Sequence, residues 1–235
     1  MISKGKLAAK PKILILAGGI SHEREISMKS AQRVADALSD AGAVVVIREP
    51  DEKLLSNIKK DKPDVIWPVL HGASGEDGAL RDILGLTGVP FVGATGAGAR
   101  LAWDKAVAKV LVQQVGLQTP HSITLPKETF RELDADGVLK SVVASLSLPL
   151  VVKPARGGSA HGVTIVRKAD QLSHAMIDAY VYCDVALIEK YVEGTELAIS
   201  VVDLGSVPIA LPAVEVVPTT GQFGYNERYT AGETN

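Results

Sequence analysis

The first hundred residues alternate short apolar runs with longer amphipathic stretches. The apolar run Lys12–Leu16 precedes paired glycines, a pattern typical of a buried parallel strand followed by a turn. Ser21 is of the type that caps a helix start, and apolar residues at helical spacing continue to Ala41, before Gly42. This alternation predicts a parallel sheet built from βαβ units. Further strands are predicted at residues 44–47, 65–70 and 90–92, with a helix at about 80–87.

The regular alternation of predicted strands and helices changes beyond residues 94–98, where we expect a domain boundary. A long helix is predicted at 99–115, because Gly116 and Pro120 then act as stop signals. The strands predicted at 150–153 and 163–166 are joined by a loop rather than a helix, which indicates an antiparallel pair. The other predicted elements are strands at 121–125 and 185–189, helices at 128–145 and 169–179, and a hairpin of 196–202 with 207–211, continued by 214–216.

Composition narrows the class of protein. The 235 residues are 46% hydrophobic with a formal net charge of −2, which suits a globular α/β chain with a sizeable core. Aromatic residues make up 4% and no Lys/Arg stripe occurs, so nucleic acid is disfavoured as a partner. The single Cys183 cannot form an internal disulfide and has no companions at zinc-ligand spacing. Without a signal sequence or a membrane-length apolar run, a cytoplasmic protein is expected, with no membrane partner.

The loop from Lys153 to Gly162 is the most informative segment. A lysine ends one strand, and a turn rich in glycine backbone N–H groups precedes the next, so the loop could fold over phosphates with Ser159 adding a hydroxyl. An ordinary hairpin with a solvated lysine is the alternative. The P-loop and dinucleotide fingerprints are both missing from the sequence, which disfavours a dehydrogenase.

Polar side chains near strand ends offer further candidates, each with a simpler alternative. Glu189 and Lys190 end an apolar strand, where a carboxylate could accept hydrogen bonds from adenine or ribose, although an edge strand would also place them there. His71 follows a strand's carboxyl end, where open α/β sheets bind ligands, but taken alone it is first interpreted as a buried structural histidine. Asp77 is interpreted as a helix cap. Glu23 could receive a substrate ammonium. Alternatively, it has no function beyond its favourable interaction with the helix dipole in the first turn.

Several motifs occur in register along residues 12–235, which makes coincidence a poor explanation. They are GGISHEREIS at 18–27, HGASGEDG at 71–78, Trp103-Asp104-Lys105, Val152-Lys153-Pro154 with Gly157-Gly158-Ser159, Ile188-Glu189-Lys190 and Glu227-Arg228-Tyr229. In this order they resemble the D-alanine–D-alanine ligases of the ATP-grasp superfamily. The resemblance implies an α/β fold with an N-terminal Rossmann-like parallel-sheet domain and an incomplete ATP-grasp fold of α+β subdomains. The expected parts are a flexible tail at 1–11, the substrate domain at 12–97, the nucleotide-binding subdomain at 98–190 and the start of a C-terminal subdomain at 191–235.

The resemblance also assigns roles to individual residues. Glu23 would hold the ammonium of the first D-alanine and His71 would lie near that substrate's carboxylate. Ser159 and Tyr229 would join Glu23 in a hydrogen-bonded set beneath a mobile loop. The residues implied to bind ATP are Lys105, Lys153 and Arg228 on the phosphate side, and Glu189, Lys190, Val192 and Glu196 around the adenosine.

The implied reaction activates the first D-alanine as an acyl phosphate, which the amine of the second D-alanine attacks. ATP and Mg²⁺ or Mn²⁺ are the implied cofactors, and a homodimer is implied as well. Tyr229 favours the dipeptide over the D-alanyl-D-lactate ester. Arg228 stands where the family generally has lysine, which exchanges a compact ammonium for a planar fork. The family's metal-binding Asp, Glu and Asn, with an accompanying Arg, are expected beyond Asn235, so the 235-residue chain by itself is expected to be inactive.

Two alternatives remain open from the sequence. The first is another ATP-grasp carboxylate–amine ligase with different substrates, against which Glu23, His71 and Tyr229 argue. The second is a fragment that only binds nucleotide or D-alanine. Phosphate release in a screen of substrates distinguishes these possibilities.

Overall fold

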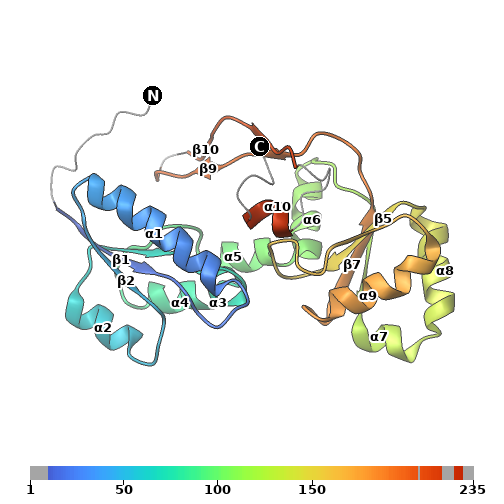
Figure 1. Ribbon diagram of the computed structural model, residues 1–235, viewed down its shortest axis with the longest axis horizontal. Helices are drawn as coiled ribbons and strands as arrows, with labels where there is room; N and C mark the ends of the chain where they lie inside the picture. The colour runs from blue at the N-terminus through green and yellow to red at the C-terminus, as the bar shows by residue number, and fades with distance from the viewer. Residues whose placement is uncertain (1–9, 206, 219–224, 230–235) are drawn as a thin grey trace. The chain divides into compact units, whose positions relative to one another are not determined.

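The computed structural model describes residues 10–205, 207–218 and 225–229, which divide into one unit ending at Ala108 and a second beginning at Lys109. Figure 1 shows the elements of both units in chain order. The predicted tail at 1–11 lies almost entirely outside the described residues, as does most of the predicted loop around Tyr229. The finer division at 97 and 190 stays a prediction.

A parallel sheet organises the first unit, as predicted. In the described residues β1 (Lys12–Leu16) is central, with β2 (Val44–Arg48) on one side and β3 (Val65–Pro68) on the other, both parallel to it. Beyond β3, Phe91 forms a parallel bridge to Ile66. The predicted strand at 90–92 is therefore reduced to one bridge.

Side chains of β1 alternate between the two faces of this sheet. Leu14 and Leu16 pack in the same cluster as Ile58 of α2 (Leu54–Asp61) and Leu84 of α4 (Ala79–Gly85). Ile13 and Ile15 pack with Ala31 and Ala35 of α1 (Arg24–Asp40). Figure 1 shows α1 on one face, and α2 and α4 on the other. Burial on both faces explains why β1 is a continuous apolar run rather than an alternating one.

The start of α1 differs from the prediction. Glu23, not Ser21, is the residue before the first helical turn. Ser21 lies two residues earlier, where its hydroxyl accepts a hydrogen bond from the Glu23 N–H at 3.3 Å and donates one to the His71 carbonyl at 3.0 Å. This serine therefore ties together the ends of two parallel strands instead of capping the helix.

An antiparallel sheet organises the second unit. Its described strands run in the order β4 (Ser122–Pro126), β7 (Val185–Lys190), β5 (Leu150–Pro154) and β6 (Thr164–Val166). The β5–β6 pairing is antiparallel, as the loop between them indicated. The core of this unit joins Val152 and Ile188 of the sheet to Leu146 of α8 (Ala135–Leu146) and Met176 of α9 (Leu172–Tyr180).

Two helices that the sequence predicted as single are each broken. The helix expected at 99–115 is α5 (Gly96–Trp103) followed by α6 (Lys105–Gln114). Asp104 between them is extended, and its carboxylate accepts hydrogen bonds from the N–H groups of Ala106 and Val107. The helix expected at 128–145 likewise divides into α7 (Lys127–Glu132) and α8, where Asp134 accepts from the Gly137 N–H at 3.0 Å. In each case an aspartate that caps a new helix overrides the apolar period.

Short antiparallel ladders follow the second sheet. β9 (Val201–Val202) pairs with β10 (Ile209–Ala210), and β8 (Leu197–Ala198) pairs with β11 (Val214–Glu215). These pairings confirm the predicted hairpin and its continuation, but the strand expected at 196–202 is divided into β8 and β9. The remaining elements are α3 (Ala73–Glu76), a 3₁₀ turn at Ala169–Gln171 and α10 (Tyr225–Tyr229). Across the described residues, helices with the length and apolarity to cross a membrane are lacking.

Candidate functional site

In the first unit, the predicted substrate residues meet at the carboxyl ends of β1 and β3. Glu23 is only 5% exposed, and Gly72 lies so close that a side chain there would begin 3.1 Å from its carboxylate. Gly72 has φ of +72°, so the conformation and the space both favour glycine. The neighbouring His71 is half-buried, with its Nε2 3.5 Å from the Ser30 hydroxyl of α1. Glu23 and His71 therefore lie in one small region of the molecule.

Glu76 approaches the same region from α3. Its carboxylate accepts a hydrogen bond from the Gly72 N–H at 3.1 Å. Burial, followed by the nearby negative charge of Glu23, raises the pKa of Glu76 above its usual value. A site in which carboxylates are crowded and partly desolvated favours a cationic group such as an ammonium. In the sequence, Glu76 stood out only as one acid of the motif at 71–78. The Asp77 carboxylate accepts from the Ala79 N–H, in agreement with the capping interpretation.

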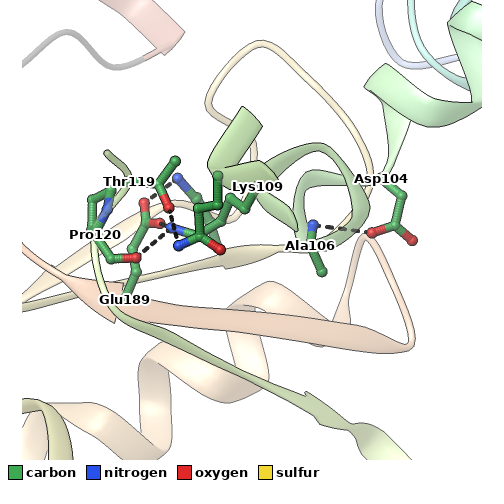
Figure 2. A network of polar contacts seen from close by, with 8 residues as sticks. Asp104, Ala106, Lys109, Thr119, Pro120 and Glu189 are labelled. Atoms are coloured by element: carbon green, nitrogen blue, oxygen red, sulfur yellow. Dashed lines mark hydrogen bonds and ion pairs between the residues drawn. The ribbon is translucent and has the colours of Figure 1, made fainter. Parts of the chain in front are cut away.

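In the second unit, Lys153 of β5 and Glu189 of β7 are paired with each other. Their strands are adjacent, and the Lys153 Nζ donates to Oε1 of Glu189. The second carboxylate oxygen, Oε2, accepts from Lys109 of α6 at 2.7 Å, and the same Lys109 Nζ donates to the Pro120 carbonyl at 2.7 Å. Figure 2 shows this network, with Lys109 between Glu189 and Pro120. We call Lys109, Lys153 and Glu189 the lysine–glutamate cluster.

The electrostatics of this cluster keep Glu189 ionised. Burial by itself would raise the pKa of Glu189, but hydrogen bonds from Lys109 and Lys153 and their positive charges outweigh it and hold the pKa below its usual value. The Glu189 side chain is 10% exposed, against 13% for Lys109 and 23% for Lys153. Lys153 is thus the more accessible of these two cations.

A pocket of about 810 Å³ lies beyond the end of β7. Val192 and Glu196, both predicted to line the adenosine site, contribute to its wall together with Tyr191, Ile165 and the residues of β11 around Glu215. The Arg167 guanidinium lies over the Tyr191 ring, 5.7 Å from the ring centroid. The pocket combines apolar, aromatic and carboxylate groups, a lining typical of small-molecule sites.

The β5–β6 loop is anchored at its far end. The His161 ring stacks on Tyr182 after α9, with centroids 5.3 Å apart. At the middle of the loop Ser159 adopts a left-handed conformation with φ of +52°, and its hydroxyl hydrogen-bonds the hydroxyl of Tyr229 from α10 at 2.5 Å. Two residues from the predicted hydrogen-bonded set are therefore in contact. Arg228 precedes Tyr229 on the same helix and is exposed.

The remaining predicted ATP ligands are placed as follows. Lys105 is the first residue of α6 and is half-buried, one helical turn before Lys109. Lys190 ends β7 and is exposed. Glu23 and His71 belong to the first unit, while Glu189, Val192, Glu196 and Tyr229 belong to the second.

Among the described residues, groups of three or more His, Cys, Asp or Glu that could hold a metal ion are lacking.

Lys109 is the member of these networks that sequence reasoning missed. It lies within an amphipathic helix, where a lysine is ordinarily solvated, and its partner Glu189 is 80 positions away. The one available signal was its spacing of four residues from Lys105, which puts both ammonium groups on one helical face.

Comparison with known proteins identifies the family. The family model described as "D-ala D-ala ligase C-terminus" matches residues 111–235. A D-alanine–D-alanine ligase of Pelotomaculum thermopropionicum is 34% identical over 221 residues, which cover 94% of this chain and 69% of the relative. The chain belongs to the D-alanine–D-alanine ligase family. A ligase of the same name from Haemophilus influenzae is 36% identical, with 94% of this chain and 71% of the relative covered.

Solved structures of this family share the fold. The VanG D-Ala:D-Ser ligase from Enterococcus faecalis superposes with a TM-score of 0.75 at 28% identity, over 97% of this chain and 76% of that one. A D-alanine–D-alanine ligase from Bacillus anthracis, complexed with ATP, gives a TM-score of 0.71 at 28% identity, over 88% of this chain and 66% of that one. The predicted family and the predicted combination of a parallel-sheet domain with an ATP-grasp fold are confirmed.

Proposed function

We propose that this ligase joins two D-alanine molecules at the expense of ATP, forming D-alanyl-D-alanine for peptidoglycan precursors. The observation that carries the proposal is a match to D-alanine–D-alanine ligases over 94% of the chain, combined with the buried Glu23 and the lysine–glutamate cluster at matching motifs. Another ATP-grasp ligase would need neither Glu23 beside His71 nor the contact between Ser159 and Tyr229.

The first D-alanine is proposed to bind at the carboxyl ends of β1 and β3. Its ammonium would face Glu23, where a buried carboxylate offers a stronger interaction than an exposed one because water screens it less. The Glu76 carboxylate, held by the Gly72 N–H, adds negative potential to the same place. His71 would orient the carboxylate of that substrate.

ATP is proposed to bind in the second unit. Its adenosine would occupy the pocket lined by Val192 and Glu196, with Glu189 and Lys190 beside it at the end of β7. Lys105, Lys153 and Arg228 would neutralise the phosphates, because cations stabilise a transferring phosphoryl group as its charge redistributes. Backbone N–H groups of the Gly157–Gly158 turn would contribute to the same task.

The proposed reaction has two steps. A carboxylate oxygen of the first D-alanine attacks the γ-phosphorus and ADP leaves, giving an acyl phosphate. The amine of the second D-alanine then attacks the acyl carbon, inorganic phosphate leaves, and the nitrogen loses its proton. An acyl phosphate hydrolyses readily, so the contact between Ser159 and Tyr229 is proposed to hold a covering loop closed and exclude water.

Other parts of the proposal rest on family resemblance. Mg²⁺ or Mn²⁺ is proposed to accompany ATP, but the described residues offer no ligand cluster for it, so we assign it no step. A homodimer and a cytoplasmic location are proposed on the same basis and stay predictions.

The test is phosphate release from ATP, measured for the 235-residue chain and for the product of the complete reading frame that encodes it. For the product of the complete reading frame, we expect phosphate release that depends on D-alanine, with D-alanyl-D-alanine as product. In Glu23→Gln, we expect the KM for D-alanine to rise by about tenfold or more, since a charge-assisted hydrogen bond to the ammonium is weakened. ATP binding should be unchanged. The matched control is Glu25→Gln, an exposed acid of the same helix turn.

The same assay distinguishes the competing functions. When D-alanine and D-serine are both supplied, formation of D-alanyl-D-serine in preference to the D-alanine dipeptide would assign the activity named for the E. faecalis structure. When D-alanine and D-lactate are both supplied near neutral pH, mostly D-alanyl-D-lactate as product would contradict the interpretation of Tyr229. Release that no D-amino acid stimulates, with a different carboxylate active instead, would assign another ATP-grasp ligase.

A further inference from the structure

The lysine–glutamate cluster holds one more cation than its carboxylate needs. Glu189 is ionised and buried, and Lys153 would be sufficient to neutralise it. Lys109 is nevertheless brought to the second oxygen from a helix far away in sequence, and is held there by the Pro120 carbonyl as well. An arrangement with two cations on one buried anion calls for a reason beyond simple neutralisation.

The two lysines differ in how firmly they are held. Lys109 has a carboxylate partner and a carbonyl partner, both at 2.7 Å, and its side chain is the less exposed. Lys153 is more exposed and stands at the start of the glycine loop. Lys153 is therefore the cation that is free to turn away from Glu189 toward an incoming anion, while Lys109 stays in place.

We propose that Lys109 is a positioning residue that keeps a cation paired with the buried Glu189 when ATP draws Lys153 toward its phosphates. This inference rests on the proposed function, because it assumes that Lys153 contacts the phosphates. If Lys109 were missing, the departure of Lys153 would leave a buried carboxylate without a cationic partner, which is strongly unfavourable. Lys153 would then remain on Glu189, and the phosphates would lose a contact.

The proposed role of Lys109 predicts different changes in affinity for the adenosine half and the phosphate half of the nucleotide. Adenosine leaves Lys153 where it is, so its affinity should barely change when Lys109 is replaced. ATP and inorganic tripolyphosphate both require Lys153 to move, so their affinities should fall. A lysine that only braced α6 against the sheet would, when removed, disturb the binding of adenosine and tripolyphosphate alike.

The experiment measures the affinity of the protein for adenosine, ATP and tripolyphosphate by calorimetry. For Lys109→Met we expect ATP and tripolyphosphate to bind about tenfold more weakly, the size expected when one charged contact is lost, and adenosine to bind within about twofold of the unsubstituted protein. Lys109→Arg should restore most of the loss. Adding Glu189→Gln to Lys109→Met should also restore tripolyphosphate binding, because Lys153 is then no longer retained by a negative charge.

The matched control is Gln113→Met. Gln113 lies one turn further along α6, and its amide donates to the Thr119 hydroxyl at 3.0 Å, so this variant removes a tie to the same loop without touching Glu189. We expect it to bind all three ligands normally. Thermal unfolding without ligand checks that each variant folds.

Three results would overturn the inference. They are unchanged ATP affinity in Lys109→Met, equal losses for adenosine and ATP, and failure of Glu189→Gln to recover tripolyphosphate binding. If the unsubstituted protein bound no ATP, the nucleotide site of the proposed function would fail too. If ATP bound with the same affinity to the unsubstituted protein and to Lys109→Met, only the role proposed for Lys109 would be wrong.

Discussion

At the scale of single residues, Glu76 and Glu189 are half-buried or buried acids with opposite shifts in pKa. Glu189 faces Lys109 and Lys153, so its charged form is favoured. For Glu76, burial disfavours the charged form, and the neighbouring Glu23 carboxylate disfavours it further, so the pKa of Glu76 is raised. The same chemical group thus stabilises the fold in one place and opposes it in another, because the sign of the nearby charge differs.

Replacement of Glu76 by Gln should stabilise the protein at neutral pH. Because the pKa of Glu76 is raised in the folded state, its ionisation costs stability as the pH rises above its unfolded pKa, and the cost is absent below it. The glutamine oxygen can still accept from the Gly72 N–H. We expect a melting temperature higher by about 2 °C near pH 7, and no gain near pH 4.

The check for Glu76 is thermal unfolding across this pH range without ligand. Glu25→Gln controls for the loss of one negative charge, since Glu25 is exposed and belongs to the first turn of α1. A lower melting temperature for Glu76→Gln at neutral pH would show that the Glu76 carboxylate stabilises this region.

At the scale of elements, capping aspartates decide where helices end and begin. Asp134 precedes α8 and accepts from the Gly137 N–H at 3.0 Å, and Asp104 serves the N-terminus of α6 in the same way. Periodicity suggested continuous helices through both positions, since the apolar spacing hardly changes across them. The side chain competes successfully because it satisfies N–H groups that the first turn of a helix leaves without partners.

Asp134→Ala should therefore weaken the second unit. We expect the free energy of unfolding to fall by about 1 kcal/mol, the usual cost of losing such a cap. Asp136→Ala is the control, because Asp136 lies in the first turn of the same helix and interacts chiefly with the helix dipole. Urea unfolding followed by circular dichroism measures both. Equal losses in the two variants would mean that charge, rather than the capping hydrogen bond, matters at Asp134.

At the scale of the whole molecule, the two units are proposed to recognise different substrates. Each has its own core, one around β1 and the other around β5 and β7. The proposed amino acid site draws on the ends of β1 and β3, whereas the proposed nucleotide pocket is lined by Ile165, residues 191–196 and residues 215–218.

Hydrogen exchange should separate the two sites. ATP should slow amide exchange at 150–162 and 189–216, because a ligand stabilises the segments it binds. D-alanine should slow exchange at 18–27 and 71–78. Residues 135–146 of α8 form an internal control, since they line neither site. If ATP protected residues 18–27 and 71–78 but not the second unit, the assignment of the sites would be reversed.

The sequence by itself determined the order of the main strands, the change from a parallel to an antiparallel sheet, and the family. These features depend on neighbouring residues. Burial on one or both faces of an element sets the spacing of its apolar residues, and the length and type of a connection indicate whether the strands it joins are parallel or antiparallel. The helix α2 was not predicted, and α5 with α6 and α7 with α8 were each predicted as one helix. Only the tertiary structure decided that Ser21 joins two strand ends, that Glu76 crowds Glu23, and that Lys109 reaches Glu189 across 80 positions. Such contacts depend on where the folded chain returns in space, and a lysine in an amphipathic helix carries the same local pattern whether it meets water or a buried carboxylate.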